Sequence, residues 1–167
     1  PLLICLMAIA IFLWVSISLT SVLVFVPGVI VSYLAFLQIS KRELDSHRIL
    51  PLYLVALAVQ LLHFTEEYLT DFVTKLPELF NQPPYPINFW IVFNMIAYAI
   101  FILGAISLFQ NKKEFYVIPL FFILIGVVFN GIAHVLLAAF VGDYFPGLFT
   151  ALAYLIIGPM LLRLVFQ

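Results

Sequence analysis

The sequence predicts an all-α, polytopic transmembrane helix bundle of five to six spans. Of its 167 residues, 66% are hydrophobic and only 9% are charged, a balance outside the range of soluble globular domains. A helix needs about 20 apolar residues to cross a hydrocarbon core about 30 Å thick, so the chain has room for spans and short loops only. The net charge of −1 and the lack of a long basic run exclude a nucleic-acid-binding protein. Cys5 is the single cysteine, which excludes an internal disulfide and a cysteine-based metal site.

The uncharged region 1–40 is predicted to be an N-terminal membrane anchor of one or two spans. A straight helix of this length would be about 60 Å long, twice the thickness of the hydrocarbon core. We therefore expect two helices, at 2–17 and 22–40, joined by a turn at 16–21. The alternative is one long, tilted helix kinked at Pro27.

Residues 41–167 are predicted to form a four-span core. A charged loop, KRELDSHR, precedes the first of these spans, and Pro51 is expected in its first helical turn, where a missing N–H does no harm. The first span should end near Tyr68, and the other three are expected at 88–109, 116–141 and 148–166.

The segment 71–89 contains four prolines and cannot be one continuous helix. We expect a short helix and a Pro-rich turn in the membrane interface, over the outer mouth of the bundle. In that place the segment could act as a lid or substrate gate.

Basic side chains mark alternate connecting regions of the predicted bundle. The positive-inside rule assigns these regions to the cytoplasm and the intervening loops to the periplasmic or exoplasmic side. With that orientation, the polar side chains within the spans fall at one depth, in the outer leaflet. The basic residues in question are Lys41, Arg42, Arg48, Lys112, Lys113 and Arg163.

Two polar motifs within the spans place reactive side chains on helix faces. In HFTEE, His63 precedes Glu66 by three residues and Glu67 by four, so both carboxylates flank the imidazole. In NGIAH, Asn130 and His134 are four residues apart and share a face. Together they would form a pocket-sized cluster, in which two carboxylates at membrane depth need a proton or a cation between them.

Two kinds of chemistry fit this cluster. His63, Glu67 and His134 could bind one divalent metal (Zn, Fe or Mn), with Glu66 as general base and Asn130 orienting the substrate or a ligand. Without a metal, Glu66 or Glu67 could exchange a proton with His63, as an isomerase or cyclase requires. In both cases we expect an enzyme that acts on a lipid or another hydrophobic small molecule at the outer leaflet.

Simpler interpretations stand beside these. The carboxylates could lie in the headgroup zone, and His134 could donate to a backbone carbonyl. Asn130 and Asn94 could join helices by hydrogen bonds, which for Asn94 is the favoured interpretation. The alternative function is a non-catalytic accessory or scaffolding subunit of a larger membrane complex.

Three segments together resemble one known family: HFTEE at 63–67, NGIAH at 130–134 and YFPGLFT at 144–150. In this order they resemble the HXXEE family of small, functionally uncharacterised integral membrane proteins, over about residues 50–165. The motif residues of that family are polar and catalytic in type, so the resemblance implies an enzyme but neither a substrate nor a metal. The positions that it singles out are His63, Glu66, Glu67, Asn130, His134, Tyr144, Pro146, Gly147 and Thr150, to which the membrane depth of Asn94 adds a further candidate substrate contact.

Overall fold

The computed structural model describes residues 1–15 and 19–167, and within them it contains helices and no strand. This confirms the predicted all-α fold. In chain order the helical elements are α1 (Leu2–Val15), α2 (Leu19–Ile39), α3 (Ser46–Leu69), α4 (Phe72–Glu78), α5 (Ile87–Phe109), the 3₁₀ turn η1 (Lys113–Phe115), α6 (Val117–Phe121), the π-helix η2 (Phe122–Phe129), α7 (Asn130–Val141) and α8 (Leu148–Phe166).

Five helical segments of the described chain are long and apolar enough to cross a bilayer, in agreement with a multi-pass membrane protein. Pro27 lies inside the first of them and Pro159 inside the last. The five segments are Val22–Ile39, Ser46–Leu69, Ile87–Phe109, Lys113–Val141 and Leu148–Phe166.

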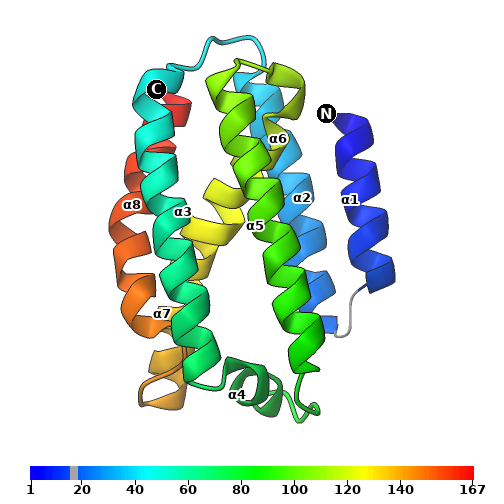
Figure 1. Cartoon of the computed structure of the whole chain (residues 1–167), viewed down its shortest axis with the longest axis vertical. Helices are drawn as coiled ribbons and strands as arrows, with labels where there is room; N and C mark the ends of the chain where they lie inside the picture. Colours follow the sequence, from blue (N-terminus) through cyan, green and yellow to red (C-terminus); the bar gives the residue numbers. More distant parts are fainter. Residues whose placement is uncertain (16–18) are drawn as a thin grey trace.

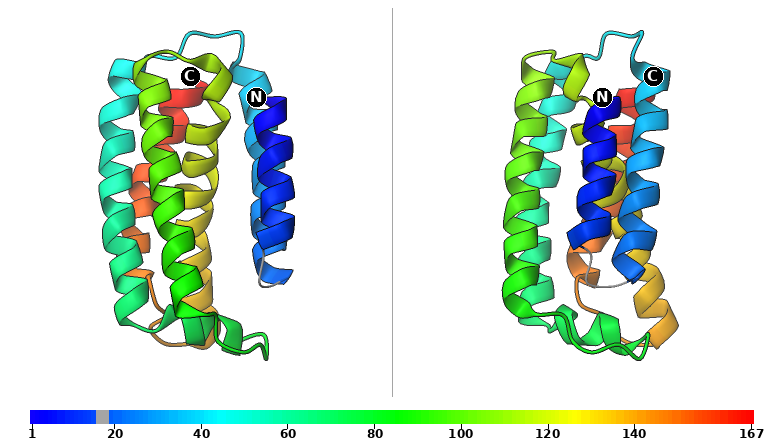
Figure 2. Two further views of the ribbon diagram at one scale, coloured as in Figure 1. Left: turned by 45° about the vertical axis from the view of Figure 1, so that its right-hand side comes forward. Right: turned by 90° about the vertical axis from the view of Figure 1, so that its right-hand side faces the viewer.

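The N-terminal region contains two helices that lie side by side, α1 and α2 (Figures 1 and 2). Of the turn predicted at 16–21, residues 16–18 lie outside the described residues, and α2 begins at Leu19. Helix α1 has 14 residues and is shorter than the five candidate spans. The number of spans in region 1–40 therefore stays a prediction.

The start of α3 corrects the expectation that Pro51 stands in a first helical turn. The helix begins five residues earlier, at Ser46, because the Asp45 side chain accepts a hydrogen bond from the backbone N–H of Arg48 at 3.3 Å. Pro51 consequently lies within the helix, where its missing N–H leaves the carbonyl of His47 without its helical partner. His47 is exposed, so water can take that place.

The core of the bundle lies where α3, η2 and α8 meet, and α8 also packs along α7 (Figure 1). Large aromatic side chains fill this core, among them Tyr53, Phe122 and Tyr154, each fully buried. Gly131 allows α7 and α8 to approach closely, because a Cβ there would lie 2.8 Å from the Cβ of Tyr154.

A π-helix interrupts the fourth candidate span directly before the NGIAH motif. It comprises the eight residues Phe122–Phe129, and α7 begins at the next residue, Asn130. A π-helix advances the chain by more residues per turn than an α-helix, so it rotates the residues that follow relative to those before. Residues of α6 and α7 at α-helical spacing therefore do not share one continuous helix face.

The segment 71–89 contains the expected short helix, α4, followed by a Pro-rich turn that leads into α5. Helix α4 crosses one end of the bundle (Figure 1), and the backbone N–H of Tyr85 donates to the carbonyl of Val73 at 2.9 Å, which holds the turn against it.

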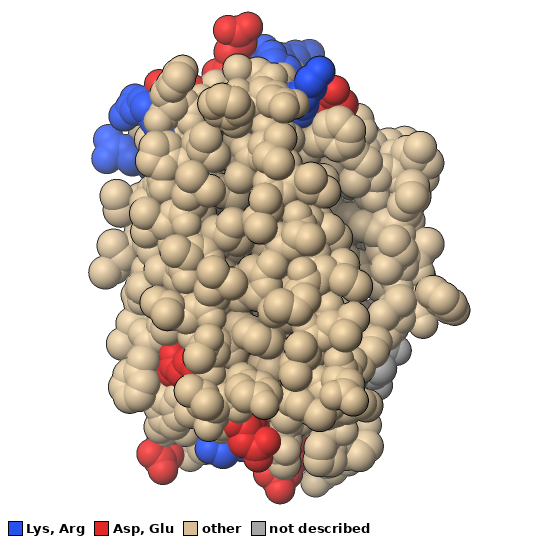
Figure 3. All heavy atoms as spheres, in the orientation of Figure 1, with Lys and Arg blue, Asp and Glu red and all other residues tan. Residues whose placement is uncertain are grey.

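The two ends of the bundle differ in charge (Figure 3). Lys and Arg gather at the end that carries the loop between α2 and α3 and both ends of the chain. The end that carries α4 shows mainly Asp and Glu. The polar motifs HFTEE and YFPGLFT lie toward this second end, since they stand at the end of α3 and the start of α8.

Candidate functional site

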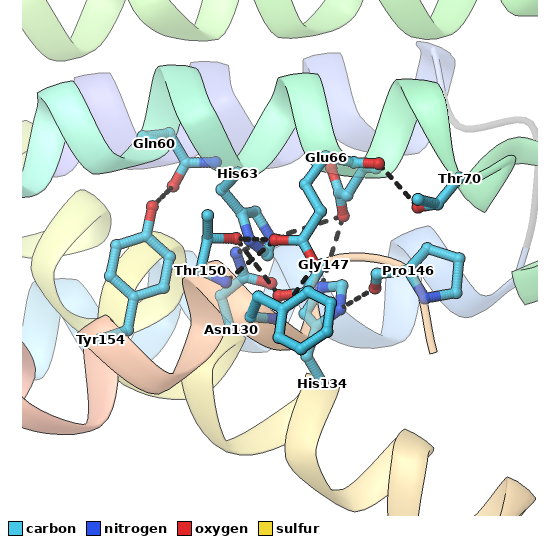
Figure 4. A network of polar contacts seen from close by, with 12 residues as sticks. Gln60, His63, Glu66, Thr70, Asn130, His134, Pro146, Gly147, Thr150 and Tyr154 are labelled. Carbon is cyan, nitrogen blue, oxygen red and sulfur yellow. Dashed lines mark hydrogen bonds and ion pairs between the residues drawn. The ribbon is translucent and has the colours of Figure 1, made fainter. Parts of the chain in front are cut away.

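Three helices bring the predicted site residues other than Asn94 together (Figure 4). Helix α3 provides His63, Glu66 and Glu67, and α7 provides Asn130 and His134. Of these, both imidazoles and Glu67 are buried, with 0% of His63, 2% of His134 and 7% of Glu67 exposed to solvent. The first turn of α8 and the residues before it complete the cluster with Tyr144, Pro146, Gly147 and Thr150.

Three potential metal ligands face one another in this cluster. Glu67 Oε1 lies 3.5 Å from Nε2 of His63 and 3.3 Å from Nε2 of His134. The three ligand atoms all lie within 4.8 Å of one another. Ligands about 2.0–2.1 Å from a tetrahedral Zn²⁺ are themselves about 3.3–3.4 Å apart, so these two separations are compatible with a metal site.

The hydrogen bond of His134 shows which of its ring nitrogens carries a proton. Nδ1 of His134 lies 2.6 Å from the carbonyl oxygen of Pro146, and a carbonyl oxygen only accepts. Nδ1 therefore carries a proton and donates it. In the neutral imidazole, Nε2 is left with a lone pair directed at Glu67, the arrangement that metal-binding histidines usually show.

His63 bonds through both of its ring nitrogens. Nδ1 lies 2.7 Å from Oγ1 of Thr150, and Nε2 lies 2.9 Å from Nδ2 of Asn130. The two imidazole planes are nearly perpendicular, at 87°, with ring centroids 4.6 Å apart. The cluster thus holds both histidines in fixed orientations around the Glu67 carboxylate.

Gly147 allows both imidazoles to pack directly against the backbone of the turn before α8. A Cβ at this position would lie 2.6 Å from Nδ1 of His134 and 2.7 Å from Cε1 of His63. Its φ of +86° also belongs to the left-handed region, which residues with a side chain rarely adopt. Glycine is therefore required here for two independent reasons.

Glu66 does not face the imidazoles. Its Oε1 accepts from the Tyr144 hydroxyl at 2.8 Å and from the Phe149 N–H at 3.0 Å, and its Oε2 accepts from the Thr150 N–H at 2.9 Å and hydroxyl at 2.6 Å. Burial raises the pKa of the Tyr144 hydroxyl, and the Glu66 carboxylate acts in the same direction, so this tyrosine stays a donor. The role of Glu66 as general base remains a prediction. The four hydrogen bonds that it accepts hold the start of α8 against α3.

Aromatic rings close the cluster on two sides. Phe72, the first residue of α4, stacks on His134 with ring centroids 5.6 Å apart, so the α4 segment covers the cluster as expected. On the opposite side the ring of Tyr154 lies 5.5 Å from that of His63, and its hydroxyl donates to Oε1 of Gln60 at 2.7 Å. Movement of α4 as a lid stays a prediction.

Asn94 is not joined to the cluster by any hydrogen bond found in the described structure. Its side chain donates instead to the backbone carbonyl of Trp90 in its own helix, at 2.9 Å. Sequence reasoning also missed contributors to the site. Gln60 stands one turn before His63, a spacing that could have indicated it, whereas Phe72 has no such signal.

Residues 54–161 match the family described as protein of unknown function with HXXEE motif. The matched segment is more than half of the chain and contains every residue of the cluster. The chain belongs to the HXXEE family. Helices α1 and α2 lie outside the matched segment, so the cluster is built entirely from the HXXEE part of the chain. Searches of curated proteins and of solved structures found no match for this HXXEE protein.

Proposed function

We propose that this protein is a membrane-embedded, metal-dependent enzyme that acts on a lipid or another hydrophobic substrate at the periplasmic or exoplasmic leaflet. In this proposal His63, Glu67 and His134 hold one divalent metal, for which two imidazoles and a carboxylate suit Zn, Fe or Mn. A cation bound there would supply Lewis-acid polarisation of a carbonyl or phosphoryl oxygen.

One observation carries the proposal: a buried carboxylate lies 3.3 Å from Nε2 of His134, which carries a lone pair in the neutral imidazole. Two acceptor atoms at this distance repel each other unless a proton or a cation lies between them. Nε2 of His63, 3.5 Å from the same carboxylate oxygen, adds a third donor atom for a cation. The set of three favours a metal over a single shared proton.

The residues around the donor atoms have roles in binding and in excluding water. Asn130 donates its amide toward Nε2 of His63, and a cation on that nitrogen would release the amide to orient a substrate oxygen. Phe72 covers His134 and keeps water from the cluster.

A hydrophobic substrate is favoured by the apolar surface around the site. Leu69 at the end of α3, Phe140 in α7 and Phe149 at the start of α8 are 73%, 79% and 70% exposed. In a bilayer such side chains contact lipid, so a substrate that dissolves in the membrane could reach the cluster laterally. The charge difference between the two ends of the bundle supports the outer leaflet through the positive-inside rule.

Metal content tests the proposal directly. The protein is purified in detergent without chelator and analysed by elemental mass spectrometry, beside His63→Ala, His134→Ala and the control His47→Ala, whose imidazole is exposed at the other end of α3. We expect about one metal per chain in the wild type and the control, and none in the other two variants. A wild type without metal would overturn the metal proposal. Metal that is retained in both His63→Ala and His134→Ala would overturn it as well.

The same measurement bears on the alternative of an accessory subunit, which stays a prediction. A cluster that serves only to pack helices needs no ion, and a subunit should purify in mild detergent with its partners in fixed proportion. Activity of a chelator-treated, metal-free sample would instead support the proton-exchange chemistry of a carboxylate and an imidazole.

A further inference from the structure

The two adjacent glutamates of the HFTEE motif face different partners. Glu67 faces the two imidazoles, whereas Glu66 turns toward the first turn of α8 and accepts four hydrogen bonds there. On a helix, neighbouring residues point about 100° apart, so both cannot serve one site in the same way.

Glu66 caps helix α8 from another helix. The first N–H groups of a helix have no partner inside it, and the residue before α8, Gly147, has no side chain to cap them. The Glu66 carboxylate accepts from the N–H groups of Phe149 and Thr150. A negative charge also interacts favourably with a helix N-terminus. Glu66 thereby fixes the position of the segment 146–150 against α3.

That same segment binds both histidines. The carbonyl of Pro146 accepts from Nδ1 of His134, and the hydroxyl of Thr150 lies 2.7 Å from Nδ1 of His63. Gly147 packs against both rings between these two contacts. The orientation of each imidazole therefore depends on the segment that Glu66 holds.

Two contacts determine the tautomer of His63: the hydroxyl of Thr150 at Nδ1 and the amide of Asn130, which donates to Nε2. Oγ1 of Thr150 lies 2.6 Å from Oε2 of Glu66, and two oxygens at that distance need a proton between them. Since Glu66 already accepts from two N–H groups and a phenol, it is the carboxylate acceptor, and Thr150 is the donor. Thr150 then has only lone pairs to offer His63, so Nδ1 of His63 carries the proton.

We propose that Glu66 and Thr150 are positioning residues that, through the 146–150 segment, hold the imidazoles in the Nδ1–H form, with Nε2 unprotonated and able to bind a metal. In the HFTEE motif, His63 and Glu67 would then be ligands, and Glu66 would orient them without contacting the metal. The role of this positioning in metal binding rests on the proposed metal site. The tautomer itself is a property of the metal-free protein.

The tautomer can be measured by long-range ¹H–¹⁵N correlation NMR on chelator-treated protein labelled with [¹⁵N]histidine. Only His47, His63 and His134 contribute, and single substitutions assign them. Spectra are recorded at about pH 9, above the usual imidazole pKa of about 6.5. We expect His63 and His134 as Nδ1–H in the wild type. A wild-type His63 in the Nε2–H form overturns the proposal without any variant.

Thr150→Val removes the hydroxyl and keeps the shape of the side chain. We expect the His63 signal to shift toward the Nε2–H form while His134, held by Pro146, stays unchanged. Thr150→Ser should restore the wild-type spectrum. The matched control is Thr65→Val, whose hydroxyl donates to Leu61 of its own helix on the exposed face of α3.

Metal affinity gives a second and separate measurement. Residues that orient metal ligands typically change affinity by about 10–100-fold, so Thr150→Val should weaken Zn²⁺ binding by that factor while Thr150→Ser and Thr65→Val do not. An unchanged His63 tautomer in folded Thr150→Val protein overturns the positioning role. A normal tautomer pattern together with a wild type that binds no metal would overturn the proposed metal site and leave the positioning role intact.

Discussion

Gly147 and His134 are in such close contact that a single methyl group would separate them: a Cβ on Gly147 would lie 2.6 Å from Nδ1 of the imidazole. This contact joins the turn before α8 to the face of α7 that carries His134. It also puts the Pro146 carbonyl within 2.6 Å of the same nitrogen. The geometry of the cluster thus depends on a backbone position that has no functional group.

Gly147→Ala should damage the cluster more than the fold alone would require. A left-handed φ costs a residue with a side chain about 1–2 kcal/mol, and the collision with both imidazoles adds about 1–3 kcal/mol of overpacking. The control is Gly142→Ala, which has a similar φ of +75° but no atom within 4 Å of the new Cβ. Thermal unfolding in detergent should show a clearly larger fall in Tm for Gly147→Ala, with loss of metal in that variant only. Equal effects of the two substitutions would contradict the contact.

Glu67→Gln and Glu66→Gln should differ in kind. The first removes the carboxylate between the two Nε2 atoms and should abolish metal binding with little change in the thermal stability of the metal-free protein. The second weakens charge-assisted bonds to the first turn of α8 and should lower stability by about 1–3 kcal/mol, with metal binding reduced but present. Unfolding curves and metal titrations on both variants test this. Identical behaviour of the two glutamines would mean that the carboxylates share one role.

Phe72→Ala should open the cluster to solvent. The ring stacks on His134, so its removal exposes the imidazole and should raise the rate at which bound Zn²⁺ passes to a strong chelator. Phe80→Ala is the control, since this phenylalanine belongs to the same segment and is already 50% exposed. Stopped-flow transfer of the metal to a chromogenic chelator measures the difference. If both variants release the metal at the wild-type rate, the α4 segment does not protect the site.

The α4 end of the bundle should face the periplasm or exoplasm. Single cysteines can be introduced at Asp143 and at Lys112 in a Cys5→Ala background, since both positions are exposed and lie in loops on opposite sides of one candidate span. A membrane-impermeant thiol reagent applied to intact cells should modify the cysteine at 143 and spare the one at 112. The reverse pattern would move the cluster to the cytoplasmic leaflet.

The sequence by itself determined the helical class and the three residues that could hold an ion. Runs of apolar residues separated by charged residues are sufficient to predict spans. Within the bilayer such a run forms a helix, because a helix pairs all of its backbone N–H and C=O groups internally. The spacing of His63 and Glu67, and of Asn130 and His134, predicted a shared cluster since residues four apart lie on one helix face. The structure brings His63, Glu67 and His134 within reach of one ion.

Only the tertiary structure decided what each polar residue contacts. Spacing placed Glu66 and Glu67 on either side of His63, but the packing of α7 and α8 against α3 determines that Glu67 meets the imidazoles and Glu66 meets the start of α8. Asn94 lies at a suitable depth and yet bonds within its own helix. Phe72 reaches His134 because α4 folds across the end of the bundle. Depth and helix face are local properties of a sequence, whereas the partner of a side chain depends on how neighbouring helices rotate and approach, which no spacing specifies.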